Sequence, residues 1–218
     1  DEILKCDIVT LHVPLNPNGI DKTHHLFDKK ILSRLKNDTI LINSSRGAVI
    51  NNLDLYDSIE KKNLKVVLDV WENEPEINVE LLNKVLIGTP HIAGYSYEGK
   101  VIGTKMIYDS LCNFLEAEKS FSFKLETPQN SIKQFDEFNK LEIGLNDLIS
   151  NIYSIQDDDN RMRKIIVMNK NERIKDFDLQ RKNYPKRREF YNYTISANKL
   201  SAQIRKILMA LRFNLEHT

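Results

Sequence analysis

Short apolar runs alternate with segments of helical spacing along the first part of the chain. The apolar runs are the expected strands, at residues 6–13, 39–43, 64–70 and 85–87. The segments of helical spacing between them are residues 28–35, 53–62 and 79–84. Alternation at this pace predicts an α/β fold with a doubly wound parallel sheet and right-handed crossovers. Because a core strand already begins at residue 6, we expect the chain to enter that sheet partway, as its C-terminal half.

The pattern changes beyond this alternating region. A long helix is expected over about residues 96–115, as the exit of a first domain that spans residues 1–118. The polar, proline-containing residues 119–130 are typical of a linker. Residues 131–218 would then form a second, α+β domain, which is small for a free-standing core. Its expected elements are a helix over 135–153, an acidic loop at 156–161, a strand at 189–196 and a helix over 199–213.

Composition excludes several classes of protein. A formal net charge of +1 over 218 residues argues against a nucleic-acid binder driven by phosphate neutralisation. No apolar run approaches the roughly 20 residues that a bilayer-spanning helix needs. Cys6 and Cys112 follow no metal or disulfide spacing, so both are expected to be buried thiols in a reducing compartment. We therefore expect a soluble cytoplasmic protein that binds neither nucleic acid nor membrane.

Two neighbouring strand ends carry an acid and a histidine. The run at 64–70 leads into Glu74, and the run at 85–87 leads into His91. Because parallel strands empty at the same edge of a sheet, the two side chains should lie side by side. A carboxylate beside an imidazole fixes one tautomer, raises the basicity of the ring and prepares it for proton transfer. A lone histidine after a strand is nevertheless more often structural than catalytic.

A third strand end adds a cation. The run at 39–43 continues into Ser44, Ser45, Arg46 and a glycine. Taken singly, Arg46 could be a surface salt-bridge partner and Glu74 an acid at a helix N-terminus. Taken as an ordered set at successive strand ends, Arg46, Glu74 and His91 favour catalysis.

These motifs resemble one family. Asn43 to Gly47, Asp69 to Pro75 and Pro90-His91 resemble the D-2-hydroxyacid dehydrogenases, whose catalytic Arg, Glu and His come in that order. Residues 90–104 and 181–189 narrow the resemblance to a branch that acts on a small phosphorylated 2-hydroxy acid. It extends from about residue 6 to the end of the chain. It implies a Rossmann-like NAD-binding domain, followed by a domain at 131–218 through which two copies form a homodimer.

The resemblance also implies roles for single residues. His91 would take the hydroxyl proton, Glu74 would hold the other ring nitrogen, and Arg46 would clamp the carboxylate while NAD accepts hydride. A capping or turn role is as probable for Asp69 as a cofactor contact, and Val13 replaces a common threonine. No residue is assigned to a metal. The implied cofactor-binding residues are Val13, Ser44, Ser45, Arg46, Asp69 and Gly94, and the implied substrate contact is Tyr95.

The chain departs from the family pattern in one respect. None of its seven glycines forms the Gly-x-Gly-x-x-Gly loop that holds a pyrophosphate at a helix N-terminus. We therefore expect the 218 residues to be the C-terminal portion of a dehydrogenase, and to bind NAD weakly and be inactive by themselves.

Several interpretations stay open at this stage. His24 and His25 suggest metal ligands, but no third ligand is near in sequence, which favours exposed or capping roles. The chain could instead be another D-2-hydroxyacid dehydrogenase, such as one acting on 3-phosphoglycerate, or a non-catalytic NAD-sensing, dimerising protein. A basic segment is either a solvated face or supplies arginines, Arg188 among them, that hold a substrate phosphate across a dimer; its members are Lys175, Arg181, Lys182, Lys186, Arg187 and Arg188.

Overall fold

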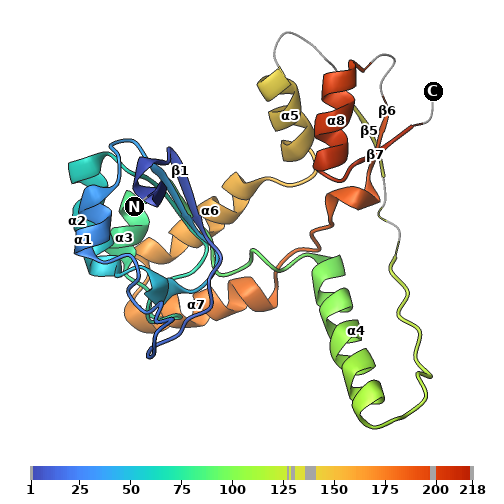
Figure 1. Ribbon diagram of the computed structural model, residues 1–218, viewed down its shortest axis with the longest axis horizontal. Coiled ribbons are helices and arrows are strands. Elements are labelled where there is room, and N and C mark those ends of the chain that lie inside the picture. The colour runs from blue at the N-terminus through green and yellow to red at the C-terminus, as the bar shows by residue number, and fades with distance from the viewer. Residues whose placement is uncertain (1, 127, 129–130, 136–140, 197–199, 217–218) are drawn as a thin grey trace. The chain divides into compact units, whose positions relative to one another are not determined.

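The computed structural model describes residues 2–126, 128, 131–135, 141–196 and 200–216. The chain forms two compact units that interleave in sequence (Figure 1). The first contains residues 1–93 and 155–184, and the second contains residues 94–154 and 185–218.

The first unit is built on a parallel sheet with the strand order β1-β2-β3-β4. Its strands are β1 (Ile8–Leu11), β2 (Ile40–Asn43), β3 (Lys65–Leu68) and β4 (Ile87–Gly88). One row of paired residues, Leu11, Asn43, Leu68 and Gly88, crosses the sheet at its carboxyl edge. The strands expected at 6–13, 39–43 and 64–70 are present but shorter than their apolar runs, and the one expected at 85–87 lies at 87–88. The chain segments that follow these strands therefore leave the sheet at one common edge.

Short helices connect the strands, and three of them begin at a side-chain cap. They are α1 (Lys29–Arg34), α2 (Asn52–Lys62) and α3 (Val79–Lys84), with the 3-10 turns η1 (Glu2–Lys5) and η2 (Gly47–Val49). Asp28, Asn51 and Asn78 each accept hydrogen bonds from backbone N–H groups of the first helical turn. These helices agree with the ranges expected from sequence to within a residue.

A later part of the chain completes the core of this unit. It comprises α6 (Ile155–Arg163), η3 (Lys164–Val167) and α7 (Lys170–Lys182), drawn in orange in Figure 1 beside the first sheet. Met162, Ile165 and Phe177 are fully buried in the same apolar cluster as the strands. The expected domain at 131–218 is thus divided between the two units.

The expectation of an acidic loop at 156–161 is wrong, because these residues lie in α6. Asp158 and Asp159 are each only 2% exposed. Asp158 forms an ion pair with Arg161, and Asp159 forms one with Arg163. Paired in this way, the acidic residues can occupy an inner helical face, which charge alone does not reveal.

The second unit has its own small parallel sheet, with the order β5-β6-β7. Its elements are α4 (Tyr97–Phe114), β5 (Ile132–Gln134), α5 (Leu141–Ser150), η4 (Phe190–Asn192), β6 (Thr194–Ser196), α8 (Ala202–Ala210) and β7 (Asn214–Leu215). The expected strand at 189–196 thus divides into the 3-10 turn η4 and the three-residue strand β6. Parts of the expected linker and of two expected helices (127, 129–130, 136–140 and 199) lie outside the described residues. The core of this unit consists of Phe135, Leu148, Tyr193, Ile195, Ile204, Leu208 and Phe213.

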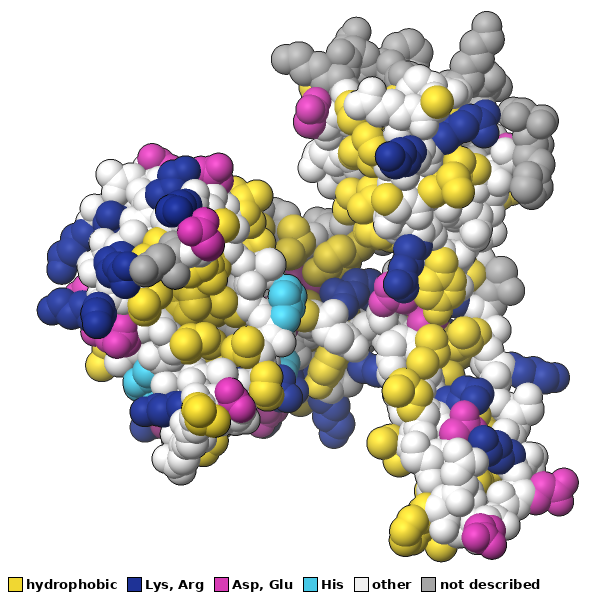
Figure 2. All heavy atoms as spheres, in the orientation of Figure 1, with side chains coloured by type: hydrophobic (Ala, Val, Ile, Leu, Met, Phe, Trp, Pro, Cys, Tyr) yellow, Lys and Arg dark blue, Asp and Glu magenta, His cyan; other side chains and the backbone are white. Residues whose placement is uncertain are grey.

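Helix α4 presents apolar side chains to solvent. Hydrophobic side chains gather along it in Figure 2, and Phe114 is 84% exposed. The exposed apolar residues of this helix are Ile102, Met106, Ile107, Leu111 and Phe114. Cys112 on the same helix is buried, whereas Cys6 is exposed, so the expectation of two buried thiols holds for one of them. Among the described residues, no helix combines the length and the apolar character needed to cross a bilayer.

Phe177→Ala tests whether α7 belongs to the first core. Phe177 is fully buried among residues of the first sheet, so truncation should lower the free energy of unfolding by about 3–5 kcal/mol. Urea denaturation monitored through Trp71, in the same core, measures this change. Leu179→Ala, at a half-exposed position on the same helix, is the control. Equal losses for the two variants would contradict the assignment.

Candidate active site

Glu74 and His91 form the pair that the strand ends predict. The Glu74 carboxylate oxygen Oε2 lies 2.7 Å from His91 Nδ1, and both side chains are partly buried. The backbone N–H of Trp71 donates to the other oxygen of Glu74 at 2.7 Å. An ionised carboxylate only accepts hydrogen bonds, so Nδ1 carries the proton. Nε2 is then the ring nitrogen that can accept a proton from another molecule.

Asp69 shapes the turn that carries His91. Its carboxylate accepts hydrogen bonds from the Thr89 hydroxyl (2.6 Å) and from the backbone N–H groups of Ile92 (2.8 Å) and Ala93 (2.9 Å). Its backbone carbonyl accepts from the N–H of His91 at 2.7 Å. His91 itself has a positive φ of 57°, a conformation that needs such support. Asp69 therefore has the turn role that the sequence left open, and its cofactor contact stays a prediction.

Asn43 organises the end of β2. Its side-chain oxygen accepts from the N–H (3.1 Å) and the hydroxyl (2.9 Å) of Ser45, and its amide donates to the carbonyl of Arg46 at 3.0 Å. Ser45 is buried, while Ser44 is half-buried and Arg46 is exposed. The Arg46 guanidinium donates to the carbonyl of Ser45 at 2.6 Å. The loop is rigid at its base and presents the guanidinium to solvent.

Gly47 allows this loop to pack against the segment that carries Glu74. A Cβ placed on Gly47 would lie 2.0 Å from the carbonyl carbon and oxygen of Trp71. Trp71 is buried, and its indole N–H donates to the carbonyl of Thr89 at 2.9 Å. The missing side chain thus brings together the three loops that follow β2, β3 and β4.

The remaining candidate residues lie as follows. Val13, just beyond β1, is half-buried and packs against the first core, and its cofactor contact stays a prediction. Gly94 and Tyr95 belong to the second unit. A Cβ on Gly94 would meet no described atom within 4 Å, so the described protein places no steric demand there. The ring of Tyr95 lies 4.1 Å from the Lys100 ammonium.

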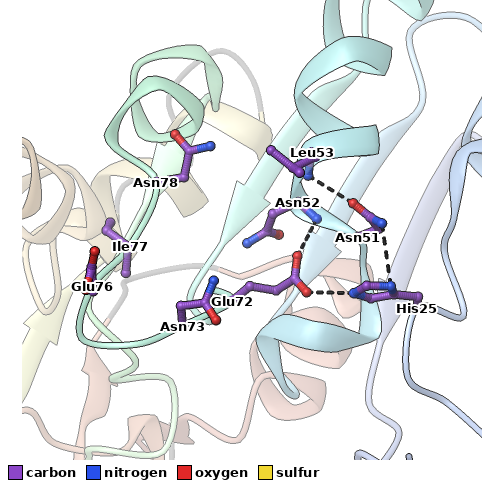
Figure 3. Close-up of a pocket in the computed structure, with 9 residues that line it drawn as sticks. All are labelled: His25, Asn51, Asn52, Leu53, Glu72, Asn73, Glu76, Ile77 and Asn78. Carbon is purple, nitrogen blue, oxygen red and sulfur yellow. Dashed lines mark hydrogen bonds and ion pairs between the residues drawn. The ribbon is translucent and has the colours of Figure 1, made fainter.

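Sequence reasoning missed a second acid–imidazole pair on the same segment. Glu72 Oε1 lies 2.6 Å from His25 Nε2, and its other oxygen accepts from the backbone N–H of Asn52, the first residue of α2, at 2.7 Å. Figure 3 shows both contacts beside a pocket of about 410 Å³. The one sequence feature that hinted at this pair is a second acid, Glu72, two residues before Glu74.

This pair corrects one argument about His24 and His25. The sequence places no third ligand near these two histidines, yet the fold brings one donor atom of Glu72 within 4.8 Å of theirs. The premise that no third ligand is nearby is therefore wrong. Both Glu72 oxygens already accept hydrogen bonds, and the two histidine rings stack at 3.9 Å. These contacts account for the cluster as a network that ties the loop before α1 to the start of α2.

The basic segment is also corrected at Arg188. Its side chain is 7% exposed and forms an ion pair with Glu98, which is fully buried. The second oxygen of Glu98 accepts from the backbone N–H of Glu189 at 2.9 Å. The alternative of a solvated charged face is therefore wrong for Arg188, whose removal would leave a buried carboxylate unpaired. The hypothesis that arginines of this segment hold a substrate phosphate across a dimer stays a prediction.

Two family models match the chain. Residues 1–93 match the family described as "D-isomer specific 2-hydroxyacid dehydrogenase, NAD binding domain". Residues 125–211 match a domain of unknown function, DUF3410. The first 93 residues are therefore similar to the NAD-binding domain of the D-isomer-specific 2-hydroxyacid dehydrogenases, which confirms the resemblance seen in the sequence and agrees with the parallel sheet.

Among individual proteins, the chain is similar to erythronate-4-phosphate dehydrogenases. It is 44% identical over 186 residues to that of Acinetobacter baumannii (strain AYE), covering 85% of this chain and 52% of the relative. It is 39% identical over 215 residues to that of Pseudomonas syringae pv. tomato, covering 97% of this chain and 57% of the relative. The chain thus spans about half the length of the curated relatives it matches.

A solved structure overlaps with part of the chain. A glyoxylate reductase from Paecilomyes thermophila is 29% identical, with a TM-score of 0.48, over 52% of this chain and 34% of that one.

Gly47→Ala tests the packing of the three loops. The added methyl group would overlap the Trp71 backbone, so we expect a loss of about 1–3 kcal/mol in the free energy of unfolding. Gly103→Ala is the control, because a Cβ there meets no described atom and alanine favours a helix by about 0.5–1 kcal/mol. Thermal denaturation of both variants decides, and an unchanged melting temperature for Gly47→Ala would contradict the packing.

Proposed function

We propose that this chain carries the catalytic residues of an NAD-dependent dehydrogenase that oxidises 4-phospho-D-erythronate to 3-hydroxy-2-oxo-4-phosphobutanoate. The observation that carries the proposal is the Glu74–His91 hydrogen bond, formed within residues that match an NAD-binding domain of 2-hydroxyacid dehydrogenases. Similarity to erythronate-4-phosphate dehydrogenases supports this substrate.

In the proposed reaction His91 is the general base. Its Nε2 accepts the proton of the substrate hydroxyl, while Glu74 holds Nδ1–H and stabilises the positive charge that the ring acquires. The exposed guanidinium of Arg46 binds the substrate carboxylate through its planar pair of donors and polarises the oxygen on C2. The three proposed catalytic residues thus come from the loops that follow β2, β3 and β4, at one edge of the first sheet.

The residues at this edge suit the nicotinamide end of NAD. Ser44 is half-buried and follows a strand end, where an open α/β sheet receives its ligand. We assign Val13, Ser44, Ser45, Arg46, Asp69 and Gly94 to the cofactor. When bound, NAD supplies the acceptor for the hydride that leaves C2.

The wider setting is part of the same proposal. The reaction would serve pyridoxal 5′-phosphate (vitamin B6) biosynthesis in the cytoplasm. The protein would act as a homodimer through its C-terminal domain, residues 131–218.

An assay of the full-length polypeptide that contains this chain tests the reaction. With NAD, erythronate 4-phosphate should produce NADH, measured by its absorbance, faster than 3-phosphoglycerate does. Preference for 3-phosphoglycerate would indicate another dehydrogenase of the family, and NAD binding without turnover would indicate a sensor. The 218-residue chain alone is expected to form no NADH, because it lacks the Gly-x-Gly-x-x-Gly loop.

Substitutions at the pair test the mechanism. His91→Gln in the full-length polypeptide should lower kcat by about 10²–10⁴-fold, because the base is removed. Glu74→Gln should cost less, since the base remains but loses its charged partner. Glu76→Gln is the matched control, an exposed acid in the same segment that pairs with Lys170. Wild-type kcat in His91→Gln would exclude the proposed role.

A further inference from the structure

We infer that Asp159 is a positioning residue for His91: from α6 it fixes the edge strand β4, which leads directly into the turn that carries the imidazole. The inference rests on the proposed role of His91 in catalysis. Asp159 lies in the segment matched by DUF3410, and His91 lies in the segment matched by the NAD-binding domain. The inference therefore assigns a role in the active site to a residue of the DUF3410 segment.

Asp159 accepts a hydrogen bond from the free edge of β4, in the place of a neighbouring strand. β4 has two residues and lies at the edge of the sheet. The N–H groups of Leu86 and Thr89 donate toward β3, at 2.8 and 2.9 Å. The N–H of Gly88 donates instead to Asp159 Oδ1 at 2.7 Å. A buried edge N–H needs such an acceptor, because leaving it unpaired costs about 1–3 kcal/mol.

Arg163 makes this contact part of a larger clamp. Its Nε donates to Asp159 Oδ2 at 2.7 Å. Its other nitrogens donate to the carbonyl of Leu82, in α3, at 2.9 Å and to that of Val85, just before β4, at 3.0 Å. The guanidinium therefore neutralises the buried carboxylate and ties the end of α3 to the start of β4.

β4 has little room to shift within this clamp. A Cβ on Gly88 would lie 2.5 Å from Leu82 Cδ1 and 3.0 Å from the Trp71 ring. Three residues beyond Gly88, the chain reaches His91, which Asp69 and Trp71 hold from the β3 side. Asp159 acts on the α6 side, so its loss would free β4 to move and carry His91 away from Glu74.

Asp159→Asn is the sharpest variant because it keeps the shape of the side chain. Asp159 accepts from Gly88 N–H with Oδ1, and from Arg163 Nε and, at 3.2 Å, the Gln156 amide with Oδ2, whereas asparagine offers one acceptor and one donor group. The donor group of asparagine would face one of these donors, so at least one contact must fail. Since a 1 Å misplacement at an active site can cost about 10²-fold, we expect kcat to fall by about 10–100-fold, with KM changed by less than about threefold.

Asp158→Asn is the matched control. Asp158 has the same 2% exposure and lies in the same helix, and the partners of its oxygens include Arg161 and the Tyr184 hydroxyl. Neither of these partners lies in β4. The same change there should leave kcat within about threefold of wild type, even if it lowers stability as much.

The His91 ring gives a readout that does not depend on activity. In the 218-residue chain, proton–nitrogen NMR of histidine side chains should show the Nδ1–H of His91 as a slowly exchanging, downfield signal, because Glu74 holds it. Asp159→Asn should broaden or remove that signal, and Asp158→Asn should preserve it.

The outcomes separate this inference from the proposed function. A preserved ring signal in Asp159→Asn, or equal effects of the two asparagine variants on the signal, would overturn the positioning role. If His91→Gln kept its activity, the proposed function would fail, and the ring signal would still decide whether Asp159 positions His91. Loss of both kcat and the signal in Asp159→Asn alone would support the inference.

Discussion

The carboxylate of Asp69 is the constraint on which the rest of the site depends. Asp69 follows the central strand β3, and its backbone N–H donates to the carbonyl of Asn43 at 3.0 Å. Its carboxylate accepts hydrogen bonds from three donors in residues 89–93. The loops after β2, β3 and β4 therefore share one anchor. A charge this deeply buried is tolerated because both carboxylate oxygens accept hydrogen bonds, which also support the left-handed conformation of His91.

Much of the first unit could be predicted because its signals are local. The apolar runs at 39–43 and 64–70 contain the strands β2 and β3, in which every second residue is buried, and Asn78 caps a helix that begins at the expected residue. The Glu74–His91 contact was also predictable, since parallel strands deliver their ends to one edge and the order of the strands fixes which ends are neighbours.

The remainder could not be predicted, because it depends on partners far away in the sequence. Asp159 looks like part of a solvated acidic loop until Gly88, 71 residues earlier, is known to donate to it. Glu72 and His25 are 47 residues apart, and the sequence does not reveal that the loop carrying His25 runs past Glu72. Arg188 belongs to a basic run, yet Glu98, 90 residues away, draws it into a buried pair. Charge patterns describe the exposed chain and do not show which charges become buried in pairs.

The interleaving of the two units has a consequence for the ancestry of this protein. The sequence families divide the chain at residues 93 and 125, whereas the first core includes Met162, Ile165 and Phe177 from beyond both points. The limits of the two sequence families therefore do not coincide with the limits of the two folded units. A gene rearrangement that separated the two families would split one hydrophobic core between two polypeptides, which gives the pair a physical reason to be inherited together.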